Sequence, residues 1–308
     1  MANSDTMSWS GTSAVQLTAG DCEVIVIPNL GMLIPSICWQ GNEIVALPGG
    51  LDAYRAGHTT GIPFLHPWAN RLSGMEYSVQ GTDVGLKVAH LHLDDQGLPM
   101  HGTMTAQADW TVTYLEADES SARCVAIFAF GDHPELLASF PFPHEIEMSV
   151  TVTTTTVLVT TTVRPTGSRA VPISFGYHPY LVLPGAARRD WVLSLPACER
   201  MALDDCGIPT GTTQQETAAI QPLAERALDD LFALGDSREF AIVGDALRIA
   251  LNFDEGYPFA QVYSPTDSEF CCIEPMTAPT NALVSGTHPT VQPGTSFEAA
   301  FTISISAA

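Results

Sequence analysis

The sequence predicts an all-β protein built as one large antiparallel β-sandwich with few short helices. Apolar and polar residues alternate with a period of two along many short segments, which is the pattern of half-buried strands. Eight threonines and four valines lie between residues 151 and 163. Gly, Pro, Asp and Asn separate the segments at short intervals. No break in composition marks a second domain, so residues 1–308 are expected to form a single domain.

The clearest element is a hairpin of two strands over residues 145–165. Residues 145–152 alternate polar and apolar side chains, and a threonine-rich junction precedes the second run from residue 156. Branching at Cβ restricts χ1 and favours pleated sheet over helix. Further strands are predicted, in chain order, over residues 22–28, 36–39, 110–115, 123–130, 191–195, 247–252, 260–263, 271–274 and 297–305.

Helical patterns are sparse. The best are residues 134–140 and 222–234, and both begin with proline, which is tolerated in the first turn of a helix. Both segments are short. Helices are therefore not expected to form the framework.

Charge and composition exclude several classes of partner. Twelve Lys and Arg against 34 Asp and Glu leave a net charge of −22, and Lys87 is the single lysine. No basic stripe is present, so neither nucleic acid nor an anionic membrane surface is an expected partner. No stretch reaches the ~20 apolar residues of a membrane span, and the N-terminus lacks a signal-peptide pattern. We expect a cytoplasmic protein, monomer or homodimer, with its seven cysteines reduced.

Polar groups gather in four segments where a strand meets a turn, at residues 67–72, 99–103, 174–181 and 272–283. Within the third, His178 lies between aromatic residues and is followed by proline. Its ring could exchange a proton at neutral pH beside the apolar face of a sugar. A buried structural histidine that bonds to the backbone fits the same pattern.

Glu274 follows an apolar run at the end of a predicted strand. Desolvation there would raise its pKa towards a value useful to a general base, although a carboxylate paired with arginine or capping a turn has the same pattern. Asn70 and Arg71, close to Trp68, offer an amide and a planar donor fork that suit a hydroxyl-rich ligand. An ordinary surface arginine is the alternative.

His90 and His92 alternate on one strand face ahead of Asp94 and Asp95. This spacing partly resembles the metal motif of metallo-β-lactamases. That motif ends in histidine where this chain has Asp95, and the helices of that fold are missing, so an exposed strand end is favoured and no metal is expected. Nucleophile-elbow and nucleotide-binding glycine motifs are also absent from the sequence, so no cofactor is expected.

Taken together, the four polar segments resemble the aldose 1-epimerase family, also called galactose mutarotases. The family's motifs occur in the family's order, between about residue 20 and the end of the chain, as Asn70-Arg71, His101-Gly102, His178-Pro179-Tyr180 and Glu274-Pro275-Met276-Thr277. The resemblance implies a galactose mutarotase-like supersandwich. It also implies a free aldohexose as substrate and no metal or nucleotide cofactor.

By position, the resemblance implies that Glu274 is the base that takes the proton of the C1 hydroxyl and His178 the acid that protonates the ring oxygen. The ring then opens, the C1–C2 bond rotates, and reclosure yields the other anomer. His101 would hold or polarise the ring-oxygen side. Arg71 would bind sugar hydroxyls, with Asn70 beside it.

The family's Asp-x-x-Phe element matches the chain if Asp229 is the sugar ligand, with Asp230 as the alternative one position away. A helix over residues 222–234 would instead place both on a solvated face. A sugar also needs an aromatic platform for its C–H face, for which Trp68, Tyr180 and Phe175 are candidates.

The sequence departs from the family at Thr103, where many members have a second glycine, and at Gly176-Tyr177. The resemblance therefore does not identify which sugar is the substrate. One alternative function is a hexose-6-phosphate 1-epimerase that uses Arg188 and Arg189, although the low number of cations argues against it. Another is a non-catalytic carbohydrate-binding protein on the same fold. The paired acid and base favour an enzyme.

Overall fold

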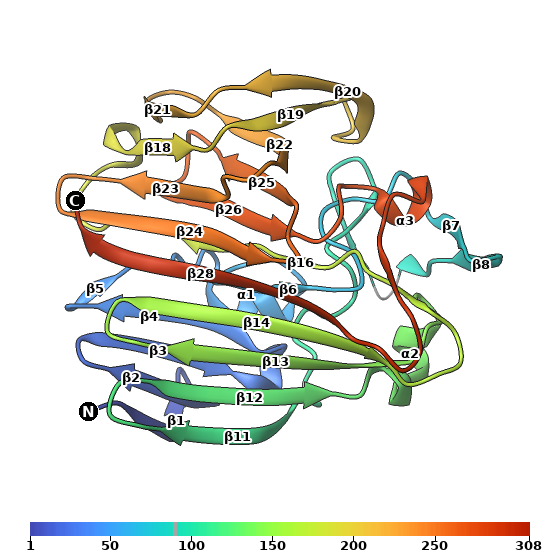
Figure 1. Ribbon diagram of the computed structural model, residues 1–308, viewed down its shortest axis with the longest axis horizontal. Helices are drawn as coiled ribbons and strands as arrows, with labels where there is room; N and C mark the ends of the chain where they lie inside the picture. The colour runs from blue at the N-terminus through green and yellow to red at the C-terminus, as the bar shows by residue number, and fades with distance from the viewer. Residues whose placement is uncertain (89–90) are drawn as a thin grey trace.

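The computed structural model describes residues 1–88 and 91–308 and confirms the all-β, antiparallel fold (Figure 1). The chain opens with a five-stranded sheet of β1 (Asn3–Trp9), β2 (Thr12–Ala19), β3 (Cys22–Ile27), β4 (Leu33–Trp39) and β5 (Asn42–Glu43).

A nine-stranded sheet forms the largest layer. In spatial order its strands are β11 (Thr111–Ala117), β12 (Ala122–Phe128), β13 (His144–Val152), β14 (Thr156–Pro165), β28 (Phe297–Ala307), β24 (Leu247–Glu255), β23 (Glu239–Val243), β18 (Val192–Leu195) and β21 (Ala219–Pro222).

An eight-stranded sheet holds most of the polar motifs. Its order is β20 (Pro209–Glu216), β19 (Cys198–Leu203), β22 (Leu228–Leu234), β25 (Phe259–Ser264), β26 (Cys271–Met276), β16 (Gly176–Tyr177) and β6 (Phe64–Leu65), with β17 (Tyr180–Leu181) also paired to β26.

Short elements complete the described chain. Two-stranded ladders join β7 (Glu76–Val79) to β8 (Thr82–Gly85), β9 (His92–Leu93) to β10 (Pro99–Met100), and β15 (Val171–Pro172) to β27 (Thr290–Val291). The helices are α1 (Gly50–Arg55), α2 (Pro134–Leu137), α3 (Ala282–Ser285) and the 3₁₀ turns η1 (Pro28–Leu30), η3 (Phe130–Asp132) and η4 (Arg188–Asp190). Within the described ranges no helix has the length and apolar character needed to span a bilayer.

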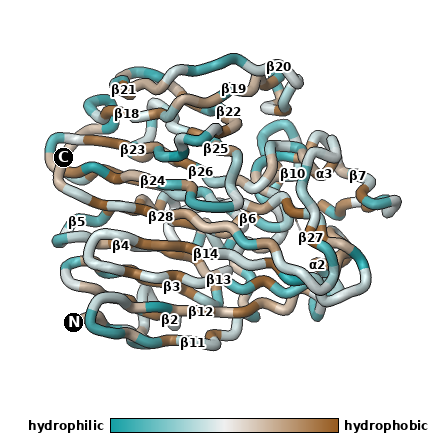
Figure 2. The backbone as a smooth tube through the Cα atoms, in the orientation of Figure 1, coloured by the Kyte–Doolittle hydropathy of each residue, from teal (hydrophilic) through white to brown (hydrophobic). Residues whose placement is uncertain are grey.

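The layers pack around one large apolar core, and two smaller buried apolar clusters accompany it among the described residues. The five-stranded sheet lies against β12 and β13 of the nine-stranded sheet, as the blue strands behind the green ones in Figure 1 show. The other half of the nine-stranded sheet packs on the eight-stranded sheet, where the rings of Phe232 on β22 and Phe240 on β23 lie 6.3 Å apart. Hydrophobic residues follow inner strands such as β4 and β14, whereas hydrophilic residues prevail on the outer strand β20 (Figure 2).

Each predicted strand overlaps a strand of the structure, and the 145–165 hairpin is confirmed as β13 and β14, with His144 paired to Pro165. The helix expected at 134–140 is present in part, as α2. The helix predicted over 222–234 is wrong, because this segment contributes the end of β21 and all of β22. The apolar residues of this segment have helical spacing, but pairing with β19 and β25 makes residues 228–234 a strand. The prediction also missed several strands, among them β1, β2, β19 and β20. The side chains of β20 are nearly all exposed and have no apolar period.

Candidate active site

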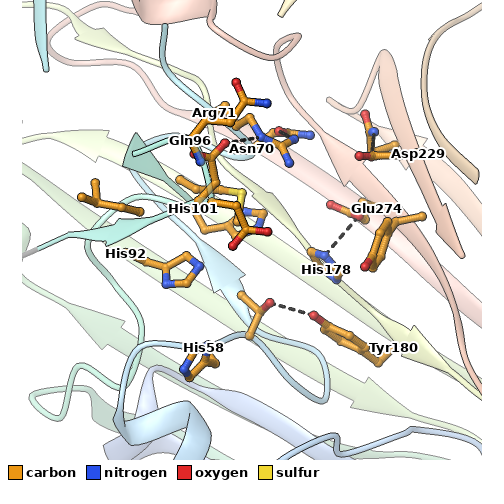
Figure 3. A pocket seen from close by; sticks show the side chains of 17 residues that line it. His58, Asn70, Arg71, His92, Gln96, His101, His178, Tyr180, Asp229 and Glu274 are labelled. Atoms are coloured by element: carbon orange, nitrogen blue, oxygen red, sulfur yellow. Dashed lines mark hydrogen bonds and ion pairs between the residues drawn. The ribbon is translucent and has the colours of Figure 1, made fainter. Parts of the chain in front are cut away.

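A cavity of about 490 Å³ lies over one face of the eight-stranded sheet and holds most of the predicted site residues (Figure 3). Its floor follows from the pleat of β26 and β25. Ile273 and Val262 point into the core, so their neighbours Glu274 and Gln261 point to the opposite face. Gln261 and Glu274 are direct cross-strand partners, and β22 adds Asp229 to the same face.

His178 reaches the cavity from the short connection between β16 and β17, which both pair with β26. Its Nε2 atom lies 3.3 Å from Oε1 of Glu274. Both residues are deeply buried, with 6% and 1% of their surface exposed. The ring of Tyr180 stacks on His178 at 4.5 Å between centroids, and the Tyr180 hydroxyl shares a 2.8 Å hydrogen bond with Thr59. The acid and base candidates therefore meet in one buried place.

Burial sets the protonation of this pair. Desolvation raises the pKa of Glu274 well above its usual value; the nearby Asp229 charge raises it further, and Arg71 opposes both. Desolvation also lowers the pKa of His178 to about 3. Both effects disfavour charge, so burial favours the neutral form of the pair, with a neutral imidazole and a protonated Glu274.

Arg71 approaches from the opposite wall, next to Asn70. Its Nε donates to Oδ2 of Asp94 at 2.8 Å, and its Nη1 donates to Oδ1 of Asn70 at 3.0 Å. Asn70 has a left-handed backbone with φ of 56°, a conformation that asparagine tolerates better than most residues. Figure 3 shows Asn70 and Arg71 at one end of the cavity and Tyr180 at the other.

His101 is held by its backbone. Its N–H donates to the carbonyl of Asn70 at 2.9 Å, and its ring lies edge-on to that of His178 at 5.3 Å. Gly102 follows with φ of 72°, and a Cβ there would lie 2.2 Å from the carbonyl oxygen of His66. The His-Gly pair thus lets the two chain segments approach closely enough to bring His101 to the cavity.

Seven predicted residues line the cavity: Asn70, Arg71, His101, His178, Tyr180, Asp229 and Glu274. The prediction for Trp68 is wrong. This side chain is fully buried in the core and does not line the cavity, because its segment pairs with Ser174 beneath the site. Phe175 is likewise a core residue, which leaves Tyr180 as the aromatic candidate.

Asp229 and Asp230 are adjacent on β22, so their side chains point to opposite faces of the sheet. Asp229 faces the cavity and accepts a hydrogen bond from Nε2 of Gln261, whereas Asp230 points away and pairs with Arg200 at 2.8 Å. Of the two candidates, the structure places Asp229 at the cavity. The helical alternative for this segment is excluded by the same strand.

A family model described as aldose 1-epimerase matches residues 13–304. The chain belongs to the aldose 1-epimerase family. A galactose mutarotase-like protein from Clostridium acetobutylicum has a similar structure, with a TM-score of 0.87 and 19% identity over 100% of this chain and 99% of that one.

Two further proteins are also similar to this chain, one in structure and one in sequence. A galactose 1-epimerase from Lactobacillus acidophilus superposes with a TM-score of 0.79 and 13% identity, over 100% of this chain and 99% of that one. The uncharacterized protein YihR of Escherichia coli (strain K12) is 24% identical over 288 residues, which cover 91% of this chain and 88% of YihR. The similar structures establish that the fold is galactose mutarotase-like.

Several cavity residues were missed from the sequence. Gln261 is 2% exposed, its Nε2 is engaged by Asp229, and its Oε1 has no partner within the described part of the chain. The strand at 260–263 was predicted, but the register that places Gln261 opposite Glu274 is not visible in one strand alone. His58 and Thr59, from the turn after α1, carried no motif at all.

Arg188 does not serve the cavity. Its guanidinium is buried and donates to Oγ of Ser264 and to the backbone carbonyls of Ser264, Ala224 and Arg226. The suggestion that it binds a phosphate near His178 is therefore wrong. This arginine instead links η4 to the end of β25 and to the segment between β21 and β22.

The histidine pair weighed as a metal motif is only partly visible, because His90 lies outside the described residues. His92 lines the cavity, with its ring 5.6 Å from that of His58 and 6.5 Å from that of His101. Over residues 1–88 and 91–308, no group of three or more His, Cys, Asp or Glu side chains is arranged to hold a metal ion.

Proposed function

We propose that the protein is an aldose 1-epimerase that interconverts the α and β anomers of an uncharged aldohexose. The observation that supports this most strongly is the 3.3 Å contact between Nε2 of His178 and Oε1 of Glu274 inside a cavity of about 490 Å³. A buried acid and base of this kind, side by side, can protonate one oxygen of a sugar while deprotonating another.

The reaction needs one proton on the pair. In the reactive form His178 is protonated and Glu274 is ionised, a state that the positive charge of Arg71 favours by lowering the pKa of Glu274. Glu274 takes the proton of the C1 hydroxyl as His178 gives its proton to the ring oxygen. The bond between C1 and the ring oxygen breaks, and a C1 carbonyl forms.

The same two groups close the ring. Rotation about the C1–C2 bond presents the other face of the aldehyde to the former ring oxygen, now a hydroxyl. This oxygen attacks C1 while its proton returns to His178, and Glu274 returns its proton to the C1 oxygen. Each proton comes back to its origin, so the sugar leaves as the other anomer and the enzyme is unchanged.

The remaining polar residues suit substrate binding. Arg71 offers hydrogen-bond donors, and Asp229 with Oε1 of Gln261 offers acceptors, which matches the mixed character of sugar hydroxyls. Burial holds the pKa of His101 well below that of a free imidazole, so the ring is neutral and can donate or accept a hydrogen bond on the ring-oxygen side. Tyr180 supports His178 by stacking.

The charges of the cavity favour a free sugar over a sugar phosphate. Among the described residues that line it, Arg71 is the one guanidinium or ammonium group, and Asp94 already neutralises it. Asp229 and Glu274 add carboxyl groups. A phosphate dianion usually recruits several cations, so a hexose 6-phosphate is a poor match. A purely binding module is disfavoured too, because it would not need the acid–base pair.

The test is an NMR or polarimetric time course of freshly dissolved α-D-glucose and α-D-galactose. We expect the wild type to accelerate mutarotation of at least one sugar. Glu274→Gln should reduce the catalysed rate by about 10²–10⁴, while Glu255→Gln, an exposed position at the end of β24, should not. Added glucose 6-phosphate should be turned over far more slowly than the free sugar.

Two results would contradict the proposal. Equal rates for wild type and Glu274→Gln would remove the general-base role. No acceleration of either hexose, combined with saturable sugar binding measured by calorimetry, would favour the carbohydrate-binding alternative.

A further inference from the structure

Two turns of the same sequence pattern face each other at the rim of the cavity. Leu-Asp-Asp-x-Gly-x-Pro occurs at residues 93–99 and again at 203–209. In the first turn Oδ1 of Asp94 accepts the backbone N–H groups two and four residues further along, at 3.0 and 2.9 Å. Asp204 makes the same two hydrogen bonds in the second turn, both at 2.9 Å. The two turns are therefore close structural copies.

The copies touch each other. Nε2 of Gln96 in the first turn donates to the backbone carbonyl of Asp205 in the second at 2.8 Å. Gly207 of the second turn lies against Arg71, since a Cβ added there would be 3.1 Å from Nη1. Arg71 is thus enclosed between the two turns.

Only one turn has a second partner for its aspartate. Oδ2 of Asp94 accepts Nε–H of Arg71 at 2.8 Å. Across the described residues the second carboxylate oxygen of Asp204 makes no hydrogen bond or ion pair. The side chain of Asp94 is 7% exposed, so this contact is well shielded from water. Shielding strengthens a charge-assisted hydrogen bond.

The contacts settle which edge of Arg71 remains open. The guanidinium has five N–H donors in a rigid plane. Asp94 takes Nε–H, and Oδ1 of Asn70 takes one N–H of Nη1. With two points of the plane held, the orientation of the guanidinium is determined. Within the described part of the chain, Nη2 has no hydrogen bond or ion pair, and Arg71 lines the cavity.

We infer that Asp94 is a positioning residue that orients Arg71 towards the sugar, with one carboxylate oxygen shaping the turn and the other holding the guanidinium. This inference rests on the proposed function for its kinetic consequence. The orientation itself does not depend on any activity.

The matched pair Asp94→Asn and Asp204→Asn tests the inference. In both variants the amide oxygen can still accept the two N–H groups, so each turn is retained. At position 94 the amide nitrogen would face Nε–H of Arg71, donor against donor. We expect Asp94→Asn to raise KM for the sugar by about ten- to a hundredfold, with kcat less affected, and Asp204→Asn to change KM by less than about twofold.

Two further measurements separate positioning from a general structural effect. In an Arg71→Ala background, Asp94→Asn should add less than about a twofold change, because the group that it orients is gone. The ¹⁵Nε–H resonance of Arg71, assigned by its loss in Arg71→Lys, should be protected from solvent exchange in the wild type and in Asp204→Asn. It should shift and lose protection in Asp94→Asn.

The inference is overturned if the Arg71 resonance is the same in Asp94→Asn as in the wild type, or if Asp204→Asn has the same effect as Asp94→Asn. Should the wild type turn over no aldose, the proposed function fails. The resonance comparison would still decide whether Asp94 holds Arg71.

Discussion

Nε2 of His178 lies 3.3 Å from Oε1 of Glu274, although the two residues belong to strands and loops far apart in the chain. Their approach is imposed by β26, which pairs with β16 through Gly176 and Met276 and with β17 through Tyr180 and Cys272. His178 is in the link between those two short strands. The pairing of strands in the sheet therefore brings the acid and the base together.

The pH dependence of the reaction should reveal this pair. Because burial raises the pKa of Glu274 and lowers that of His178 to about 3, the pair binds its second proton only in strong acid. We expect kcat/KM to change less than about twofold between pH 5 and 7, and to fall on the alkaline side as the pair loses its one proton. An acid limb centred near about pH 6.5, the pKa of a free imidazole, would contradict this assignment.

Asp229 and Asp230 provide an internal comparison for sugar binding. Asp229→Asn removes a carboxylate that faces the cavity and should raise KM about tenfold or more, the effect of losing a charged hydrogen bond. Asp230→Asn breaks only the partly exposed pair with Arg200 and should leave KM within about twofold. Steady-state kinetics of the two variants check the prediction, and equal effects would refute it.

Gly102→Ala should destabilise the protein and displace His101. A side chain at φ of 72° costs about 1–2 kcal/mol, and the overlap of its Cβ with the carbonyl of His66 costs about 1–3 kcal/mol more. Gly286→Ala is the control, because φ is 75° there but nothing lies within 4 Å of the added atom. Urea denaturation should show the larger loss for Gly102→Ala; a loss no greater than that of the control would argue against the close approach.

Substitution of Arg188 should destabilise the protein much more than substitution of Arg189, and neither substitution should change the preference for a free sugar. Arg188→Met leaves the buried carbonyls of Ala224, Arg226 and Ser264 without their donor and should lower the free energy of unfolding by more than about 3 kcal/mol. Arg189→Met, at an exposed position, should change it by less than about 0.5 kcal/mol. A specific loss of activity on hexose 6-phosphate in either variant would restore the phosphate interpretation.

Much of the fold was predictable because strand formation depends on local pattern. The alternation over residues 145–165 predicts the hairpin that forms β13 and β14, and it does so without knowledge of any partner. Segment 222–234 shows the limit. Its apolar residues at 223, 227, 228, 231 and 232 have helical spacing. The pairing of β22 with β19 and β25 overrides this local preference.

Site residues were predictable where the catalytic or binding side chain is itself part of a sequence motif. Glu274, His178 and Arg71 were recognised by type and order, and all three line the cavity. Trp68 was misplaced because an aromatic beside a polar motif can face either side of the chain, and here it faces the core. Gln261 was overlooked because its importance lies in being opposite Glu274.

The sequence by itself determined the all-β class, the positions of most strands and the chemical groups available for catalysis, since each depends on residues close together in the chain. Only the tertiary structure decided register, and register decides which side chains share a face. It placed Asp229 at the cavity and Asp230 outside it. It also placed Arg71 so that Asp94 of the first turn, and not Asp204 of the second, accepts its Nε–H. Both outcomes follow from the two-residue period of the strand and from which segments happen to be neighbours in space.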